Sequence, residues 1–178
     1  ILLENKIDYD REKIENIQKF INKNKSSKSG KTLSLKENLW LFVSNQKVEV
    51  ISKTEKNNDE IPIKECGDYN FDGKIFSIQK YDEIPQKYPD DKDFVAYISI
   101  DKIDFILRHR KDGDKIHPLG SRGSQKLKKY LNEKKIPQHK KNDLFLICNG
   151  NEVLWVAGIG ISEKIKVVNK PTHMITLK

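Results

Sequence analysis

Cysteine and long apolar runs are both scarce in this chain of 178 residues. Its two cysteines, Cys66 and Cys148, lie far apart and form no CxxC pair, which argues against a disulfide framework and a zinc knuckle. No segment approaches the roughly 18 consecutive apolar residues of a membrane span, and the N-terminus lacks the pattern of a secretory signal. These absences predict a soluble, cytoplasmic protein that does not bind a membrane.

Catalytic motifs are also missing. Ser29-Gly30-Lys31-Thr32 looks like the end of a nucleotide-binding P-loop, but Lys25 stands where that motif requires glycine, and no apolar strand precedes it. Four residues could be imagined as a metal site: His109, Asp112, Asp114 and His117. Their spacing matches no known ligand pattern, and the surrounding lysines disfavour a divalent cation. We therefore expect neither a metal nor a cofactor in this chain.

Positive charge is concentrated in residues 105–141, which read FILRHRKDGDKIHPLGSRGSQKLKKYLNEKKIPQHKK. This segment holds twelve Lys and Arg against three Asp and Glu, a net charge of +9, whereas the rest of the chain sums to −1. The total of +8 is therefore a local feature. A local excess of this size predicts a polyanionic partner for the segment.

A lysine-rich helix is expected over residues 125–135, with Ser124 as its N-cap. Leu127, Tyr130 and Leu131 follow helical spacing, so they predict one buried stripe. The start of the helix is expected to offer free N–H groups to a phosphate. A solvated basic helix explains such a pattern about as well, but the adjacent Arg-His-Arg-Lys cluster favours nucleic acid.

The periodicity along the chain predicts an α+β fold. It consists of an N-terminal helical segment over residues 8–23, antiparallel strands, and then a small α+β C-terminal domain. Strands are expected at residues 39–43, 48–52, 74–79, 94–100, 144–148, 153–159, 164–168 and 173–177. Residues 53–73 and 82–93 are polar and are expected to be loops. We place a domain boundary between residues 1–102 and 103–178.

The basic segment and the strand after it resemble the C-terminal substrate-recognition domain of the bacterial tRNA(Ile)-lysidine synthetases. The matching residues are Arg108, Arg110, Gly113 and Asp114, then Pro118-Leu119-Gly120, then Gly123, Lys126, Leu127 and Lys128, then Lys135-Ile136-Pro137, and finally Leu154, Trp155 and Gly158. Two positions depart from the family pattern, since Lys141 replaces an arginine and Phe145 a proline. Lysine keeps the charge but loses the bidentate fork, so we carry over no role for Lys141.

The resemblance implies a tRNA-binding region that grips the acceptor stem of tRNA(Ile), while the parent enzyme joins lysine to the wobble cytidine of the anticodon using ATP. The family's catalytic ATP pyrophosphatase domain carries a Ser-Gly-Gly-x-Asp-Ser loop, and this string is absent from the sequence. We therefore expect a region that lacks the catalytic domain and is inactive alone. ATP and Mg²⁺ are expected only with that domain, which would be a partner together with tRNA(Ile). A homodimer of the parent is left open.

The resemblance and the charge pattern together assign two groups of residues. Phosphate contacts are expected from Arg108, Arg110, Lys111, Arg122, Lys126, Lys128 and Lys135. Structural roles in the motif are expected for Gly113, Asp114, Pro118, Gly120, Gly123 and Pro137. Arg108 and Arg110 alternate along a strand, so we expect them to share one face and one contact.

Two other functions stay open on the sequence. One is a protein-interaction module whose basic helix docks an acidic partner. The other is a stand-alone metal-dependent hydrolase that uses His109, Asp114 and His117.

Overall fold

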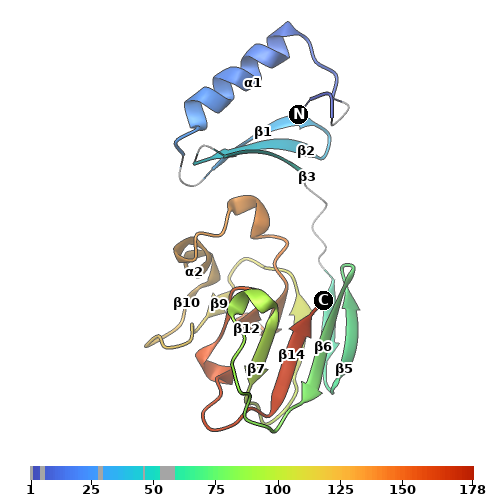
Figure 1. The fold of residues 1–178 in the computed structure, drawn as a ribbon, viewed down its shortest axis with the longest axis vertical. Coiled ribbons are helices and arrows are strands. Elements are labelled where there is room, and N and C mark those ends of the chain that lie inside the picture. Colours follow the sequence, from blue (N-terminus) through green and yellow to red (C-terminus); the bar gives the residue numbers. More distant parts are fainter. Residues whose placement is uncertain (1, 5–6, 28–29, 46, 53–58) are drawn as a thin grey trace. The chain divides into compact units, whose positions relative to one another are not determined.

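The computed structural model describes residues 2–4, 7–27, 30–45, 47–52 and 59–178 (Figure 1). The chain forms two compact units. Unit 1 comprises Ile1–Lys56 and Pro137–Lys140, and unit 2 comprises Asn57–Ile136 and Lys141–Lys178. Ser29 of the P-loop-like string and residues 53–58 of the first expected loop lie outside the described residues.

Unit 1 is a helix packed on an antiparallel sheet. Helix α1 (Arg11–Asn24) begins after Asp10, whose carboxylate accepts a hydrogen bond of 2.7 Å from the Lys13 amide. The sheet consists of β1 (Lys31–Lys36), β2 (Leu39–Ser44) and β3 (Lys47–Ser52), paired in sequence order. The core consists of Ile7, Leu35, Leu41 and Val43, covered by Ile17, Phe20 and Ile21 of α1. The expected N-terminal helix and the hairpin after it are confirmed.

Unit 2 contains a seven-stranded and a four-stranded sheet among the described residues. The larger sheet consists of β4 (Glu60–Ile63), β8 (Phe105–Arg108), β9 (Lys115–Ile116), β10 (Gln125–Lys126), β11 (Leu146–Asn149), β12 (Glu152–Val156) and β13 (Gly160–Ile161). The smaller sheet has the order β5 (Gly67–Phe71), β6 (Lys74–Lys80), β14 (His173–Leu177) and β7 (Val95–Ile98). All pairs are antiparallel except β9 with β12. The expected α+β fold class is confirmed.

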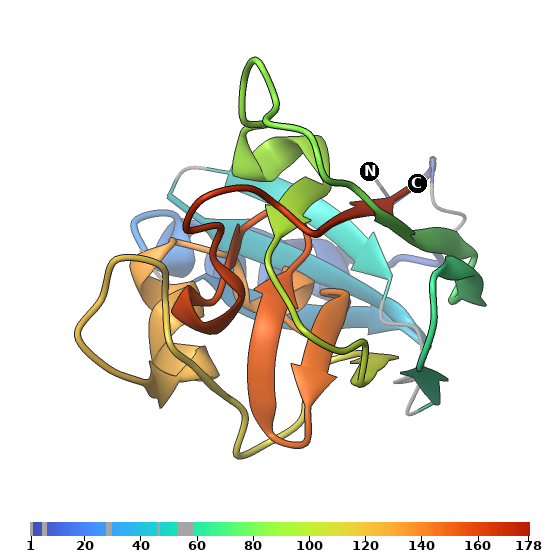
Figure 2. The ribbon, with the colours of Figure 1, turned by 90° about the horizontal axis from the view of Figure 1, so that it is seen from below.

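Two hydrophobic cores stabilise unit 2. The first lies between the sheets and includes Phe76 and Ile175 of the smaller sheet and Leu107 and Trp155 of the larger one. The second lies beneath helix α2 (Leu127–Glu133), where the expected stripe is confirmed because all three of its residues are buried. The β11–β12 hairpin, orange in Figure 2, contributes residues to both cores. The basic segment is therefore attached to a well-packed support.

Three local predictions are wrong. Helix α2 begins at Leu127 and not at residue 125, because residues 125–126 pair with β9 as strand β10. The strand expected at residues 164–168 is absent, since Glu163–Ile165 forms the 3₁₀ turn η3. Strands β4 and β5 lie in the segment expected to be a loop. Two further 3₁₀ turns are η1 (Asp91–Asp93) and η2 (Gln138–Lys140).

The boundary predicted between residues 102 and 103 lies inside unit 2. Strand β4 pairs with β8, and β6 pairs with β14, so both sheets combine strands from the two sides of that position. Among the described residues, no helix is both long enough and apolar enough to cross a bilayer.

Candidate nucleic-acid interface

Arg108, at the end of β8, is a buried residue with 2% of its surface exposed. Its two terminal nitrogens donate to the two carboxylate oxygens of Asp114 at 2.8 and 3.0 Å, and also to the carbonyls of His109 and Gly150. Burial alone would lower the pKa of Arg108, but the hydrogen bonds to Asp114 hold it above its ordinary value. The prediction that Arg108 is a surface phosphate contact is therefore corrected, because its guanidinium is occupied inside the protein.

The same carboxylate shapes the turn that follows β8. Asp114 accepts a hydrogen bond of 2.8 Å from the Lys111 amide, and Gly113 has a φ of +92°, which favours glycine. The Lys111 side chain forms an ion pair with Glu60 of β4, and Glu60 also lies 3.7 Å from the Arg108 Nε. Two cations of the predicted site are thus neutralised locally. We call Arg108, Asp114, Lys111 and Glu60 the Arg108 network.

Three of the four residues of the imagined metal site, His109, Asp114 and His117, have separate partners. The two ring nitrogens of His109 each lie 3.0 Å from an acceptor, the Leu144 carbonyl and an Asp72 carboxylate oxygen. His117 lies 2.9 Å from the Ser121 carbonyl, and Asp114 belongs to the Arg108 network. Across the part of the chain that the structure describes, no three His, Cys, Asp or Glu side chains are grouped to hold a metal. The geometry gives no support to a metal-dependent hydrolase.

Helix α2 carries exposed lysines, and its first amide is hydrogen-bonded within the protein. Its N-cap is Lys126, which makes no capping hydrogen bond through its side chain, and the Leu127 amide donates to the Asp114 carbonyl at 2.9 Å. The expectation of a Ser124 cap is therefore wrong, and the first amide of the helix, that of Leu127, is not free for a phosphate. Four exposed cations of the predicted site make no ion pair with any described carboxylate: Arg122, Lys126, Lys128 and Lys135. Lys129, by contrast, lies 3.9 Å from Glu133.

Arg110 and Lys141 lie beside this helix and have only neutral acceptors. Arg110 donates from its Nη2 to the Asn142 side-chain oxygen at 3.3 Å, while its buried Nε has no partner. Lys141 is 4% exposed and donates to the Asn132 side-chain oxygen of α2. Burial lowers the pKa of Lys141, and the positive charges of Arg110 and Lys128 lower it further.

We call Arg110, Lys128 and Lys141 the Lys141 cluster. The sequence analysis assigned no role to Lys141, which therefore was not among the predicted site residues. One signal in the sequence pointed to it, because lysine keeps the positive charge where the family pattern has arginine. Arg110 contacts Asn142, the residue after Lys141, and Lys128 lies four residues before Asn132 on α2, so both lie near Lys141. The structure does not bring Arg108 to the same surface as Arg110, because β8 ends at Arg108.

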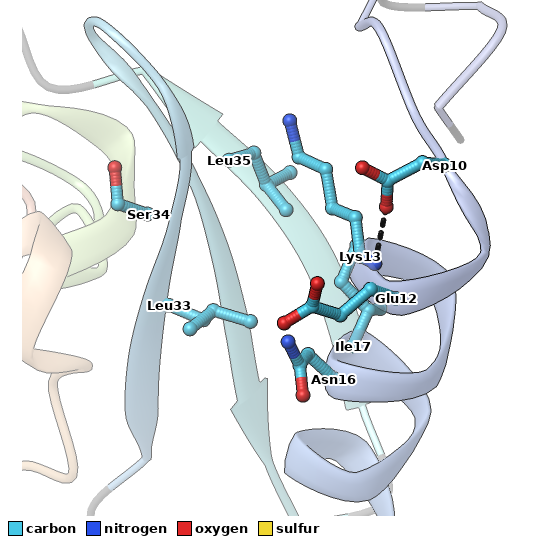
Figure 3. Close-up of a pocket in the computed structure, with 8 residues that line it drawn as sticks. All are labelled: Asp10, Glu12, Lys13, Asn16, Ile17, Leu33, Ser34 and Leu35. Carbon is cyan, nitrogen blue, oxygen red and sulfur yellow. Dashed lines mark hydrogen bonds between the residues drawn. The ribbon is translucent and has the colours of Figure 1, made fainter.

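Unit 1 has a cavity of about 330 Å³ between α1 and β1 (Figure 3). Its lining residues are Asp10, Glu12, Lys13, Asn16, Ile17, Leu33, Ser34 and Leu35. The Asp10 carboxylate already caps the helix through the Lys13 amide, as Figure 3 shows, so it is occupied by a structural hydrogen bond. We assign no ligand to this cavity.

Comparisons with known proteins agree on one family. Residues 105–176 match the family model described as the TilS substrate C-terminal domain. A tRNA(Ile)-lysidine synthase of Clostridium tetani is 35% identical over 126 residues, which cover 69% of this chain and 27% of that protein. One of Persephonella marina is 30% identical over 171 residues, which cover 91% of this chain and 36% of that protein. The chain thus spans roughly a third or less of these two relatives.

A crystal structure of a TilS C-terminal domain is also similar, with a TM-score of 0.49 and 20% sequence identity. The match covers 67% of this chain and 95% of that one.

Proposed function

Since residues 105–176 belong to the TilS substrate C-terminal domain family, we propose that this chain is the tRNA-binding region of a tRNA(Ile)-lysidine synthase. Its substrate is the isoleucine tRNA, and its partner is the catalytic N-terminal domain of the parent enzyme. The site of action is the cytoplasm, where tRNA is modified. Ligation of lysine to the wobble cytidine, with ATP and Mg²⁺, belongs to the partner domain.

The observation that carries this proposal is the set of cations without carboxylate partners. Arg122, Lys126, Lys128 and Lys135 are exposed and make no ion pair with any carboxylate the structure describes. Unpaired cations on a well-packed domain suit a polyanion, because each one can replace a condensed counterion on a phosphate. Double-stranded RNA is recognised largely through its backbone and shape, which requires this kind of surface and little base readout.

We further propose that the bound element is the acceptor stem of the tRNA. That stem is a duplex, and it is remote from the anticodon where lysine is added. A region that holds the acceptor stem positions the anticodon for the catalytic domain without taking part in the chemistry. The exposed lysines of α2 and the preceding loop supply this grip, and the Arg108 network supports the strand and turn behind them.

Competition binding tests the proposal against the protein-interaction alternative. Labelled tRNA is bound to the purified chain, and unlabelled tRNA or polyglutamate is added at equal total charge. We expect tRNA to displace the label and polyglutamate to displace far less of it. Equal displacement by the two competitors would favour an acidic protein partner and overturn the proposal.

Activity of the same preparation tests the division of roles. Given tRNA, ATP, Mg²⁺ and lysine, the purified chain should bind the tRNA and form no lysidine, as measured by mass spectrometry of the digested nucleosides. Formation of lysidine would assign catalysis to this chain.

A further inference from the structure

The Lys141 cluster includes a buried lysine that no carboxylate among the described residues neutralises. Lysine is almost never fully buried unless it is paired, yet Lys141 is 4% exposed and its hydrogen-bond acceptor is the neutral amide of Asn132. We propose that Arg110, Lys128 and Lys141 form a seat for one phosphate group of the bound tRNA. This inference rests on the proposed function and assigns Lys141 a role that the sequence pattern did not.

The acceptors that hold Arg110 and Lys141 are neutral. Asn132 accepts from Lys141 and Asn142 accepts from Arg110, so two neutral side-chain amides orient the positive groups without neutralising them. In the Arg108 network, a carboxylate takes the equivalent place beside the guanidinium. No carboxylate that the structure describes therefore neutralises Arg110 or Lys141.

Arg110 also has a donor without an acceptor among the described residues. Its Nε is buried and has no hydrogen-bond partner, which is uncommon for a buried donor. A phosphate carries several strong acceptor oxygens together with negative charge. Such a ligand answers both deficits of the cluster, namely the unused donor and the uncompensated charge.

The three cations are linked by geometry, since Arg110 contacts Asn142 next to Lys141, and Lys128 lies four residues before the Lys141 acceptor Asn132 on α2. Burial lowers the pKa of Lys141, and the positive charges of Arg110 and Lys128 lower it further. A bound anion would offset this repulsion on Lys141. A purely structural lysine in the same place would gain nothing from an anion.

Thermal unfolding in phosphate-free buffer and in inorganic phosphate tests the seat. We expect phosphate to raise the melting temperature of the unsubstituted chain. Lys141→Met keeps a long apolar side chain and removes the buried charge, so its melting temperature in phosphate-free buffer should be unchanged or higher. The rise caused by phosphate should be lost in Lys141→Met and retained in Lys141→Arg.

Two further variants test the phosphate seat even if Lys141→Met does not fold. Lys128→Met changes an exposed residue and should also reduce the phosphate-induced rise, whereas Lys129→Met, whose lysine is paired with Glu133, should leave the rise intact. The seat is refuted if Lys141→Met melts lower in phosphate-free buffer and still shows the full rise, because that pattern belongs to a structural lysine. It is also refuted if Lys128→Met and Lys129→Met behave alike.

Binding of tRNA separates this inference from the function on which it rests. If the unsubstituted chain and Lys141→Met bind tRNA equally well, the seat fails while the proposed function stands. If no tRNA binds but the phosphate-induced rise still depends on Lys141, the anion seat stands and the proposed function fails. The source of the phosphate is read from tRNA with and without its 5′-phosphate. A Lys141→Met loss seen with both tRNAs indicates an internal phosphodiester, and a loss seen only with 5′-phosphorylated tRNA indicates the terminal group.

Discussion

The cations of the Arg108 network and of the Lys141 cluster all lie in the basic segment, residues 105–141, but the protein surrounds them in opposite ways. In the network, a buried guanidinium is closed by a bidentate carboxylate, and the neighbouring Lys111 is neutralised by Glu60. In the cluster, Arg110 and Lys141 are held by amides and no described carboxylate pairs with them. From this difference we propose that a cation of the basic segment can bind RNA only where the fold leaves it without a carboxylate partner.

The largest effect is expected from breaking the network. Asp114→Ala leaves the Arg108 guanidinium buried without its carboxylate, and removal of one partner of a buried ion pair costs about 3–5 kcal/mol. Urea denaturation measures the free energy of unfolding. Lys128→Ala, on the exposed side of the comparison, is the control and should stay within about 0.5 kcal/mol of the unsubstituted chain. A stable Asp114→Ala variant would contradict the structural role of the network.

A second substitution weakens the packing beneath α2 and leaves every charge of the Lys141 cluster in place. Leu127 is 1% exposed in the core beneath α2, so Leu127→Ala should cost about 2–5 kcal/mol through the cavity it leaves. At a temperature where the variant is still folded, its affinity for tRNA should be close to normal, since no charge has changed. An unchanged melting curve would mean that α2 does not pack as the structure describes.

The reactivity of the two cysteines measures the integrity of the fold around the Arg108 network, and neither cysteine is a predicted phosphate contact. Cys148 is buried, and burial raises the pKa of its thiol to about 12, whereas Cys66 is exposed. At pH 8 a thiol with that pKa is ionised to the extent of about one part in ten thousand. An aromatic disulfide reagent should therefore modify Cys66 quickly and Cys148 only as fast as the chain opens. In Asp114→Ala the second reaction should accelerate, and rapid labelling of both thiols in the unsubstituted chain would refute the burial of Cys148.

Local periodicity predicted the elements that depend on local pattern. The N-terminal helix, the β2–β3 and β11–β12 hairpins and the stripe of α2 follow from the spacing of apolar residues, and all are present. Strands β4 and β5 could not be recognised in this way, because their sequences EIPI and GDYNF are short and mostly polar or broken by proline or glycine. Strand β4 forms because the distant strand β8 offers it a pairing edge, whereas β5 pairs with the next strand, β6, across the turn at Asp72-Gly73.

The candidate site was predicted at the level of the segment and not of each side chain. The local excess of Lys and Arg predicted the segment correctly. The alternation of side chains along a strand predicted that Arg108 and Arg110 share one face, but alternation applies only as far as the strand extends. Strand β8 ends at Arg108, and an aspartate six residues later turns the guanidinium into a core group. Lys141 was missed for the converse reason, since nothing in the sequence shows that its nearest acceptors are amides.

The salt dependence of tRNA binding tests most directly the claim that unpaired cations make the interface. Log K is measured against log salt concentration for the unsubstituted chain, for Lys128→Ala and for Lys164→Ala, whose lysine is paired with Glu152. If Lys128 neutralises a phosphate, Lys128→Ala should reduce the slope by about one unit, and Lys164→Ala should leave it nearly unchanged. Equal reductions in the two variants would contradict the account, because pairing with a carboxylate would then make no difference to RNA binding.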